Sequence, residues 1–250
     1  MTASNKPGTP FTIWGESESS EACWSCGEMR AAHFCEACGK LQPAAPTDFF
    51  SFFGLPRKLD LDTAALEKEF YKLSRRLHPD VYAQASGQEQ QWSLEKSSQV
   101  NDAYRALKDP ITRTEYLLRL EGMHLEEQSK TATEQARQGG KQKKQAVPPE
   151  LLEEVFELNL QLEEMRAEKA MGERDPEIAR RLEGAQAEWQ GKLDGLLTEL
   201  KGYWREWDGL VESGANEEGR RGVREKMLGL LNRRSYIRNL VRDVGEVLEE

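Results

Sequence analysis

The sequence predicts an all-α protein that consists of a small metal-binding module, a helical hairpin and a C-terminal three-helix bundle. Three observations support this fold class. Apolar residues recur at three- and four-residue intervals over long segments, which is the period of an α-helix. Charged residues make up 32% of the 250 residues and hydrophobic residues only 38%, a composition typical of long, solvent-exposed helices. All four cysteines lie between residues 23 and 38, apart from the segments with helical periodicity.

Composition also excludes several classes of function. The formal net charge of −9 argues against nucleic acid as the main partner, because binding to phosphates needs a basic surface. No stretch approaches the roughly 18 consecutive apolar residues of a membrane span. Only three histidines are present, which leaves few candidates for a general base, so we expect that the chain is not an enzyme. The first residues resemble neither a signal peptide nor an Arg-rich transit peptide, and we therefore expect a cytoplasmic location.

Changes in composition divide the chain into five segments. Residues 129–147 contain five basic residues and one acidic residue, a local charge of +4, and they lack apolar periodicity. A segment of this composition is typical of a flexible linker. The expected segments are a disordered tail at 1–22, a tetracysteine module at 23–42, a helical region at 48–125, a basic flexible linker at 126–147 and the bundle at 148–250.

The four cysteines form two Cys-x2-Cys pairs, each followed by a glycine. Such a turn directs two thiolates at one metal ion, and glycine tolerates the positive φ that ends the turn. Two pairs close a tetrahedral shell and leave no open position, so we expect a structural Zn²⁺ site rather than a catalytic one. Iron in the same shell is the alternative, because the ligand type alone does not separate the two metals. The ligands are Cys23, Cys26, Cys35 and Cys38.

Aromatic residues flank these cysteines. We expect Trp24 and Phe34 to form a miniature core beside the metal and His33 to lie on the surface. Because so small a module has little core of its own, metal removal should unfold it while the helices survive.

The helical region begins with an aromatic segment and continues as two long helices and a shorter one. Asp62 or Thr63 can cap the first long helix, which must end at His78 because the residue before a proline avoids the helical region. Its apolar stripe is Leu66, Phe70, Leu73 and Leu77, and basic residues lie on the other side: Lys68, Lys72, Arg75 and Arg76. The second helix carries Val100, Ala103, Tyr104 and Leu107 and ends before Asp109-Pro110, and the third carries Tyr116, Leu117 and Leu120.

This region resembles a J-domain, the module by which co-chaperones engage DnaK-type chaperones. The resemblance rests on the aromatic opening DFFSFFGLP at 48–56 and on RRLHPD at 75–80, with His-Pro-Asp directly after a basic amphipathic helix. It implies that the loop and the basic face bind the chaperone and trigger ATP hydrolysis there. The implied residues are His78, Pro79, Asp80, Lys68, Lys72, Arg75 and Arg76. The alternative for the basic stripe is a solvated helix face, which would be the favoured interpretation if His-Pro-Asp did not follow the helix.

The C-terminal region predicts three helices with a turn at 213–219. The first of these helices has a core stripe of Leu151, Val155, Leu158, Leu162 and Met165. It also has a second apolar stripe of Leu152, Phe156 and Leu160, and excess apolar residues on a helix commonly mark a docking site.

Together with VNDAYRALKDPITRTEYLLRLEG at 100–122, these features resemble the iron–sulfur cluster co-chaperone HscB family, some members of which carry a four-cysteine module. The resemblance implies a site for an IscU-type cluster scaffold on this helix, and a DnaK/HscA-type chaperone as the other partner. The implied contacts are Leu152, Phe156, Glu157, Leu160, Glu164 and Tyr236. Glu153 stands where an apolar residue is usual in the family, and Leu160 where an acid is usual.

Three alternatives stay open at this point. Phe156 and Leu160 could pack on the helical region or in a homodimer. The chain could be a J-domain protein for another client, with the bundle as a dimerisation element. The cysteine module and the basic linker could bind nucleic acid, in which case binding would weaken steeply with salt.

Overall fold

The computed structural model describes residues 22–28, 33–125, 147–171 and 176–249. The expected tail at 1–22 and the linker at 126–147 therefore lie almost entirely outside the described residues. The described residues are organised as helices and contain no β-strand, although Phe34 forms an isolated antiparallel bridge with Leu41, so the all-α fold class is confirmed. Within this part of the chain, no helix is long and apolar enough to cross a bilayer.

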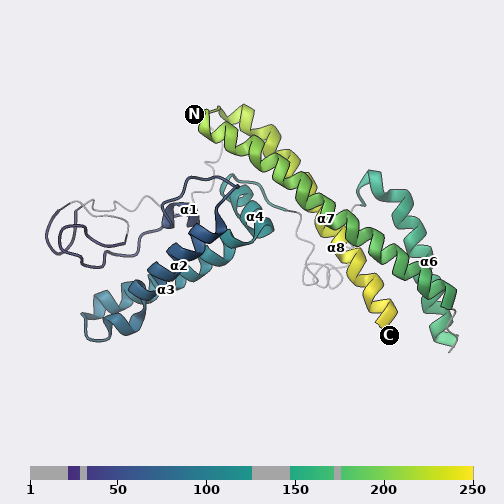
Figure 1. Cartoon of the computed structure of the whole chain (residues 1–250), viewed down its shortest axis with the longest axis horizontal. Helices are drawn as coiled ribbons and strands as arrows, with labels where there is room; N and C mark the ends of the chain where they lie inside the picture. Colours follow the sequence, from purple (N-terminus) through teal and green to yellow (C-terminus); the bar gives the residue numbers. More distant parts are fainter. Residues whose placement is uncertain (1–21, 29–32, 126–146, 172–175, 250) are drawn as a thin grey trace, which may run out of the picture. The chain divides into compact units, whose positions relative to one another are not determined.

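The chain divides into two compact units, which are described separately (Figure 1). The N-terminal unit comprises the described residues of 1–56 together with 62–108. The C-terminal unit comprises 57–61 and the described residues of 109–250.

The N-terminal unit is built on an antiparallel pair of helices, α2 (Thr63–Leu77) and α3 (Gly87–Lys108). The short helix α1 (Phe49–Phe52) precedes them, and the 3₁₀ turn η1 (Pro79–Tyr82) joins them. The carboxylate of Asp62 caps α2 by accepting hydrogen bonds from the amides of Ala64 and Ala65, both at 3.0 Å. Helix α2 ends where the sequence predicts, since His78 before the proline is extended, with φ −61° and ψ 133°.

The core of this unit contains the predicted stripes of both long helices and also a residue of the cysteine module. Its fully buried members are Leu41, Phe52, Leu73, Leu77, Val100 and Ala103. Leu41, which follows the last cysteine, is 1% exposed. The cysteine module is therefore packed against the hairpin and shares its hydrophobic core.

The C-terminal unit contains the predicted three-helix bundle. Its helices are α6 (Leu152–Met171), α7 (Pro176–Glu212) and α8 (Glu217–Glu249), and the 3₁₀ turn η2 (Pro149–Leu151) precedes α6. The turn between α7 and α8 needs a left-handed residue, which Gly214 supplies with φ 65°. The predicted core stripe of the first helix is buried at Leu151, Val155, Leu158, Leu162 and Met165.

Helix α4 (Pro110–Leu120) and the loop 57–61 pack in this same unit, although sequence analysis grouped them with the hairpin. Two tryptophans near the end of α7 form hydrogen bonds with helix α4 and with the loop 57–61. The indole of Trp204 donates to the hydroxyl of Thr114 at 2.9 Å, and the indole of Trp207 donates to the carbonyl of Arg57 at 2.9 Å. The carboxylate of Asp208 accepts hydrogen bonds from the amides of Leu59 and Asp60 in the same loop, at 2.7 and 2.9 Å.

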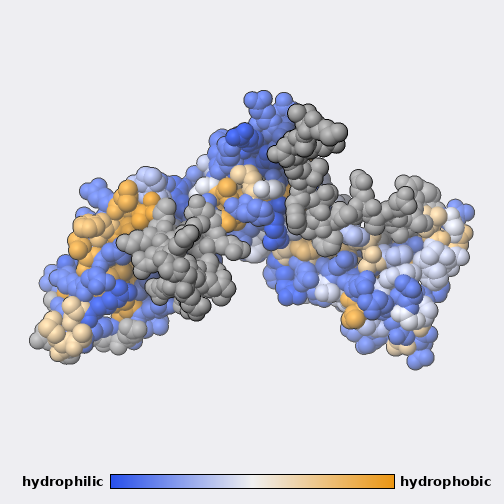
Figure 2. Space-filling view, turned by 180° about the vertical axis from the view of Figure 1, so that it is seen from behind, coloured by the Kyte–Doolittle hydropathy of each residue, from blue (hydrophilic) through white to orange (hydrophobic). Residues whose placement is uncertain are grey.

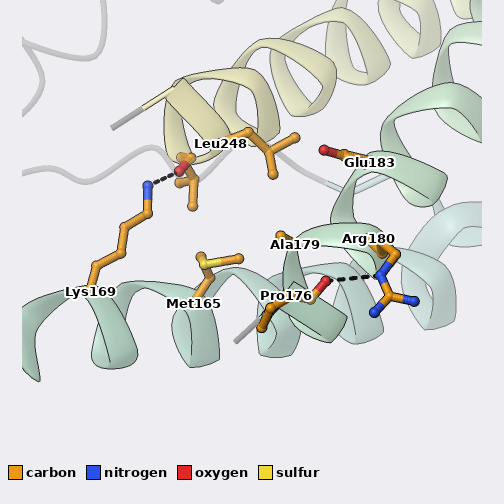
Figure 3. Close-up of a pocket in the computed structure, with 8 residues that line it drawn as sticks. Met165, Lys169, Pro176, Ala179, Arg180, Glu183 and Leu248 are labelled. Atoms are coloured by element: carbon orange, nitrogen blue, oxygen red, sulfur yellow. Dashed lines mark hydrogen bonds between the residues drawn. The ribbon is translucent and has the colours of Figure 1, made fainter. Parts of the chain in front are cut away.

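A cavity of about 440 Å³ lies near the ends of the three bundle helices (Figure 3). Met165 contributes to its apolar lining. The two basic side chains at its edge are engaged by backbone, Lys169 by the carbonyl of Val247 and Arg180 by the carbonyl of Pro176 (Figure 3).

Candidate functional site

The four cysteine sulfurs form a group that fits one tetrahedral metal ion. All four Sγ atoms lie within 4.8 Å of one another. The distances from Cys23 to Cys38 and from Cys26 to Cys35 are 3.7 and 3.6 Å. Zinc–sulfur bonds of about 2.3 Å place the sulfurs of a tetrahedron about 3.8 Å apart, whereas a disulfide needs about 2.05 Å. The geometry is therefore that of a metal shell and is compatible with structural zinc.

The backbone around the cysteines has the conformation that such a shell requires. Gly27 and Gly39 close the two turns with φ of 77° and 71°. The amide of Ser25 and the side-chain amide of Gln42 each donate to the sulfur of Cys23 at 3.4 Å. Burial opposes ionisation of Cys23, but these donors and the Cys26 amide outweigh it and lower the pKa of this thiol to about 6. The module thus favours a thiolate ligand at Cys23.

Removing the metal should loosen the cysteine module and leave the helices in place. Treatment with a strong chelator should release about one metal ion per chain, as expected for a single shell of four thiolates. The far-UV circular dichroism of the chain should change little. Loss of most of the helical signal on metal release would contradict this division of the fold.

The aromatic residues of the module contact the hairpin, so the predicted miniature core is wrong. Trp24 is 47% exposed, and its indole donates to the carbonyl of Leu41 at 2.8 Å. Its ring meets the edge of Trp92 on α3, with centroids 5.6 Å apart. Phe34 is half-buried and packs against the hydrophobic core of the hairpin. A module with so few apolar residues gains more by adding them to a neighbouring core than by building its own.

His33 is half-buried rather than on the surface, which corrects the prediction. Its Nε2 forms a hydrogen bond of 2.8 Å with the carbonyl of Phe52, and the two rings lie 4.5 Å apart. Burial lowers the pKa of His33, and the Phe52 carbonyl only partly opposes this. His33 therefore anchors the cysteine module to α1 through Phe52.

The His-Pro-Asp loop is presented to solvent at the end of α2. The side chain of His78 is 54% exposed and that of Asp80 is 90% exposed. Nδ1 of His78 lies 3.3 Å from the amide of Asp80, from which it accepts a hydrogen bond, and 3.4 Å from its carboxylate. The loop begins η1, and Pro79 occupies its first position, where a fixed φ stiffens the turn.

The predicted basic residues lie on the same helix as the loop. The residues Lys68, Lys72, Arg75 and Arg76 are all exposed. Lys72 forms an ion pair with Glu69 at 3.1 Å, and the guanidinium of Arg76 lies 3.8 Å from the centre of the Phe34 ring. The structure therefore brings the seven predicted chaperone-binding residues together at α2 and the turn after it.

The second predicted site forms an apolar stripe along the solvent side of α6. Leu152, Phe156 and Leu160 are 54%, 65% and 56% exposed, and they follow at four-residue intervals on one helix face. Hydrophobic surface also gathers over the C-terminal helices in Figure 2. Glu157 and Glu164 are exposed on the same helix, and Glu164 lies 3.8 Å from Arg181.

Tyr236 differs from the other predicted members of this site because it is only 8% exposed. An ion pair between Glu150 and Arg233, at 3.7 Å, brings the start of α6 beside the turn of α8 that precedes Tyr236. Tyr236 thus follows a residue that contacts the segment before α6, but it offers little of its own surface to a partner.

Three comparisons with known proteins agree with this arrangement. Residues 48–116 match the family model described as DnaJ domain. The mouse (Mus musculus) iron-sulfur cluster co-chaperone protein HscB is 34% identical over 157 residues, which cover 60% of this chain and 61% of the mouse protein. The co-chaperone protein HscB homolog of Vibrio parahaemolyticus is 33% identical over 155 residues, which cover 60% of this chain and 82% of that protein.

The fold is also that of a solved relative. The crystal structure of human co-chaperone protein HscB matches with a TM-score of 0.60 and 24% identity, and it covers 90% of this chain and 97% of the human chain. A J-domain with an exposed His-Pro-Asp loop, joined to a helical bundle, defines a J-domain co-chaperone. The chain belongs to the HscB family of co-chaperones.

Proposed function

We propose that this chain is an adaptor in iron–sulfur cluster assembly. Its J-domain binds a DnaK/HscA-type chaperone and stimulates ATP hydrolysis by that chaperone. Its C-terminal bundle binds an IscU-type scaffold and delivers the scaffold to the chaperone. The observation that carries the proposal is the presence of two exposed sites on one chain, the His-Pro-Asp loop and the α6 stripe. The name of the mouse relative, an iron-sulfur cluster co-chaperone, supports the choice of client.

Electrostatic attraction explains the role of the basic face of α2. Lys68, Arg75 and Arg76 project into solvent along α2, the helix that leads into the loop, so they attract and orient an acidic surface. Complementary charge of this kind raises the association rate and fixes the orientation of a complex. Asp80 then reaches the chaperone with a carboxylate that is 90% exposed.

The α6 stripe has the composition of a protein interface. Leu152, Phe156 and Leu160 form its apolar centre, and the acidic residues Glu157 and Glu164 lie on the same helix. A centre of large apolar side chains bordered by charge is the usual anatomy of a specific interface. It fits a scaffold surface with an apolar groove and a basic border.

Joining the two sites in one chain is the basis of the proposed mechanism. Binding of the scaffold to the bundle makes its encounter with the chaperone intramolecular, which raises its effective concentration there. The adaptor itself carries out no chemical step in this scheme. The ATPase reaction takes place on the partner.

Replacing Phe156 by alanine should weaken scaffold binding at least tenfold. Phe156 is the largest exposed side chain of the stripe, and large aromatic residues dominate the energy of such interfaces. Because it is 65% exposed, the variant should fold normally. Isothermal titration calorimetry with purified scaffold measures the affinity.

Met171→Ala is the matched control, since this residue is 69% exposed at the other end of the same helix. We expect it to leave the affinity unchanged. Equal affinities of Phe156→Ala and the unmodified chain would place the scaffold site elsewhere. If Phe156→Ala instead dissociates a dimer of this chain without affecting the scaffold, the stripe is a dimer interface.

A further inference from the structure

The cysteine module contacts the hairpin close to the His-Pro-Asp loop. Phe34 lies under the guanidinium of Arg76, two residues before His78, at 3.8 Å from the ring centre. Lys40 pairs at 3.1 Å with Glu89, in the first turn of α3 directly after the loop. Ser86 also donates to the Glu89 carboxylate, at 2.9 Å from its hydroxyl. The module therefore touches both ends of the segment that presents the loop.

Arg76 is held by this contact without being covered. One face of its guanidinium stacks on Phe34, yet the side chain stays exposed and its N–H groups can still reach a partner. The charge of Arg76 also interacts with His33 in the module and with Tyr82 in η1. Arg76 thus lies between the module and the turn that carries the loop.

An arginine fixed in advance binds more tightly than a free one. A long side chain loses much rotamer freedom when it is immobilised at an interface. Stacking on an aromatic ring removes part of that freedom before the partner arrives, and the planar guanidinium is suited to it. Part of the conformational entropy of the Arg76 side chain is then lost when this chain folds, and less is lost when the chaperone binds.

We propose that Phe34 is a positioning residue for Arg76, and that the metal centre sets the affinity of this chain for its chaperone by folding the module that carries Phe34. The inference rests on the proposed function, because it assumes that the basic face of α2 binds a chaperone. It adds a role for the cysteine module, whose metal shell has no open position for chemistry.

The position of Phe34 depends directly on the metal shell. Phe34 precedes the ligand Cys35 and forms an antiparallel bridge with Leu41. The amide of Cys35 donates to the carbonyl of Lys40 at 2.9 Å, and the amide of Gly39 donates to the carbonyl of Cys35 at 2.9 Å. The turn that brings Cys35 and Cys38 together therefore also fixes the positions of Phe34 and Lys40. This turn of the cysteine module should become disordered when the metal is removed.

The first test is the concentration of this chain that gives half-maximal stimulation of the chaperone ATPase. Phe34→Leu keeps an apolar contact with the core but removes the aromatic face. We expect the half-maximal concentration to rise about threefold, the size of an exposed cation–π contact, with an unchanged maximal rate. Phe34→Tyr should restore the original value. In an Arg76→Ala background, Phe34→Leu should have no further effect.

A different pattern would overturn the proposal. If Phe34→Leu raises the half-maximal concentration equally with and without Arg76, the module acts through the fold and not through this arginine. An unchanged half-maximal concentration in Phe34→Leu, or failure of Phe34→Tyr to restore it, would equally refute a positioning role.

The second test does not require the chaperone. The Nε–H resonance of Arg76, observed by ¹⁵N NMR on the full chain, should be shifted upfield by the ring current of Phe34. Phe34→Leu should remove this shift, and so should chelation of the metal, while the amide resonances of α3 persist. A resonance that is insensitive to both changes would overturn the proposed coupling.

The two tests separate this inference from the proposed function. If the unmodified chain does not stimulate any DnaK-type ATPase, the proposed function fails and the claim about affinity fails with it. If the unmodified chain stimulates the chaperone ATPase normally, but the Arg76 resonance changes neither in Phe34→Leu nor on metal removal, only the present inference fails.

Discussion

Replacing Asp80 by asparagine should reduce stimulation of the chaperone ATPase at least tenfold without changing the stability of this chain. The side chain of Asp80 is 90% exposed, so its charge contributes little to the fold. Its carboxylate is available to pair with a basic group on the chaperone, and asparagine keeps the shape but loses the charge. Steady-state ATPase assays over a range of co-chaperone concentrations measure the effect, and thermal unfolding checks the fold.

Asp102→Asn is a suitable control for this experiment. Asp102 is a 54% exposed carboxylate on α3 that pairs with Arg105 at 3.2 Å. We expect this variant to stimulate like the unmodified chain. His78→Gln should resemble Asp80→Asn, since His78 accepts the hydrogen bond that shapes the loop. Undiminished stimulation by both loop variants would contradict the assignment of the chaperone site.

Replacing Trp207 by alanine should destabilise the C-terminal unit by about 3–5 kcal/mol, the usual cost of emptying so large a buried site. Trp207 is 1% exposed, and its indole holds the loop 57–61 through the carbonyl of Arg57. Trp207→Phe keeps most of the apolar volume and should lose only about 1 kcal/mol for the hydrogen bond together with a smaller packing loss. Urea unfolding followed by circular dichroism measures these differences.

Trp24→Ala supplies the matched control, because this tryptophan is 47% exposed and belongs to the other unit. We expect it to leave the unfolding of the C-terminal unit unchanged. A cost below about 1 kcal/mol for Trp207→Ala would mean that the end of α7 does not hold loop 57–61 as tightly as the contacts indicate.

Local sequence features predicted much of the fold. The proline after His78 ends α2, and the aspartate before Pro110 caps α4 with hydrogen bonds to the amides of Ile111 and Thr112 at 3.0 and 2.8 Å. The spacing of the cysteines placed four sulfurs around one point. These features depend on neighbours a few residues away, which a single sequence displays. The second stripe of the first bundle helix is also exposed at Phe156, as an unpaired apolar face should be.

Contacts between distant segments could not be predicted in the same way. The sequence predicted His33 on the surface, but its ring forms a hydrogen bond with the carbonyl of Phe52, 19 residues further along the chain. Arg224 pairs at 2.8 Å with Glu121, which lies 103 residues away, and is 5% exposed as a result. Helical periodicity shows which face of a helix is buried but not which segment buries it. For that reason α4 was grouped with its neighbours in sequence and not with its partners on α7 and α8.

The role of Phe34 also depends on such a contact. A phenylalanine beside a metal ligand suggests packing around the metal, and only the structure shows that its ring faces Arg76. The nearest clue in the sequence is that the module holds several aromatic residues and has no apolar stripe with which to bury them.

In the proposed function, this chain brings a cluster scaffold to a chaperone by binding both at once. The most direct test of this simultaneous binding is the ATPase rate of the chaperone, measured with the co-chaperone alone, with the scaffold alone and with both together. We predict that the rate with both exceeds the sum of the separate stimulations, and that Phe156→Ala removes this excess while keeping the stimulation by the co-chaperone alone. An excess that survives in Phe156→Ala, or no excess with the unmodified chain, would contradict the account.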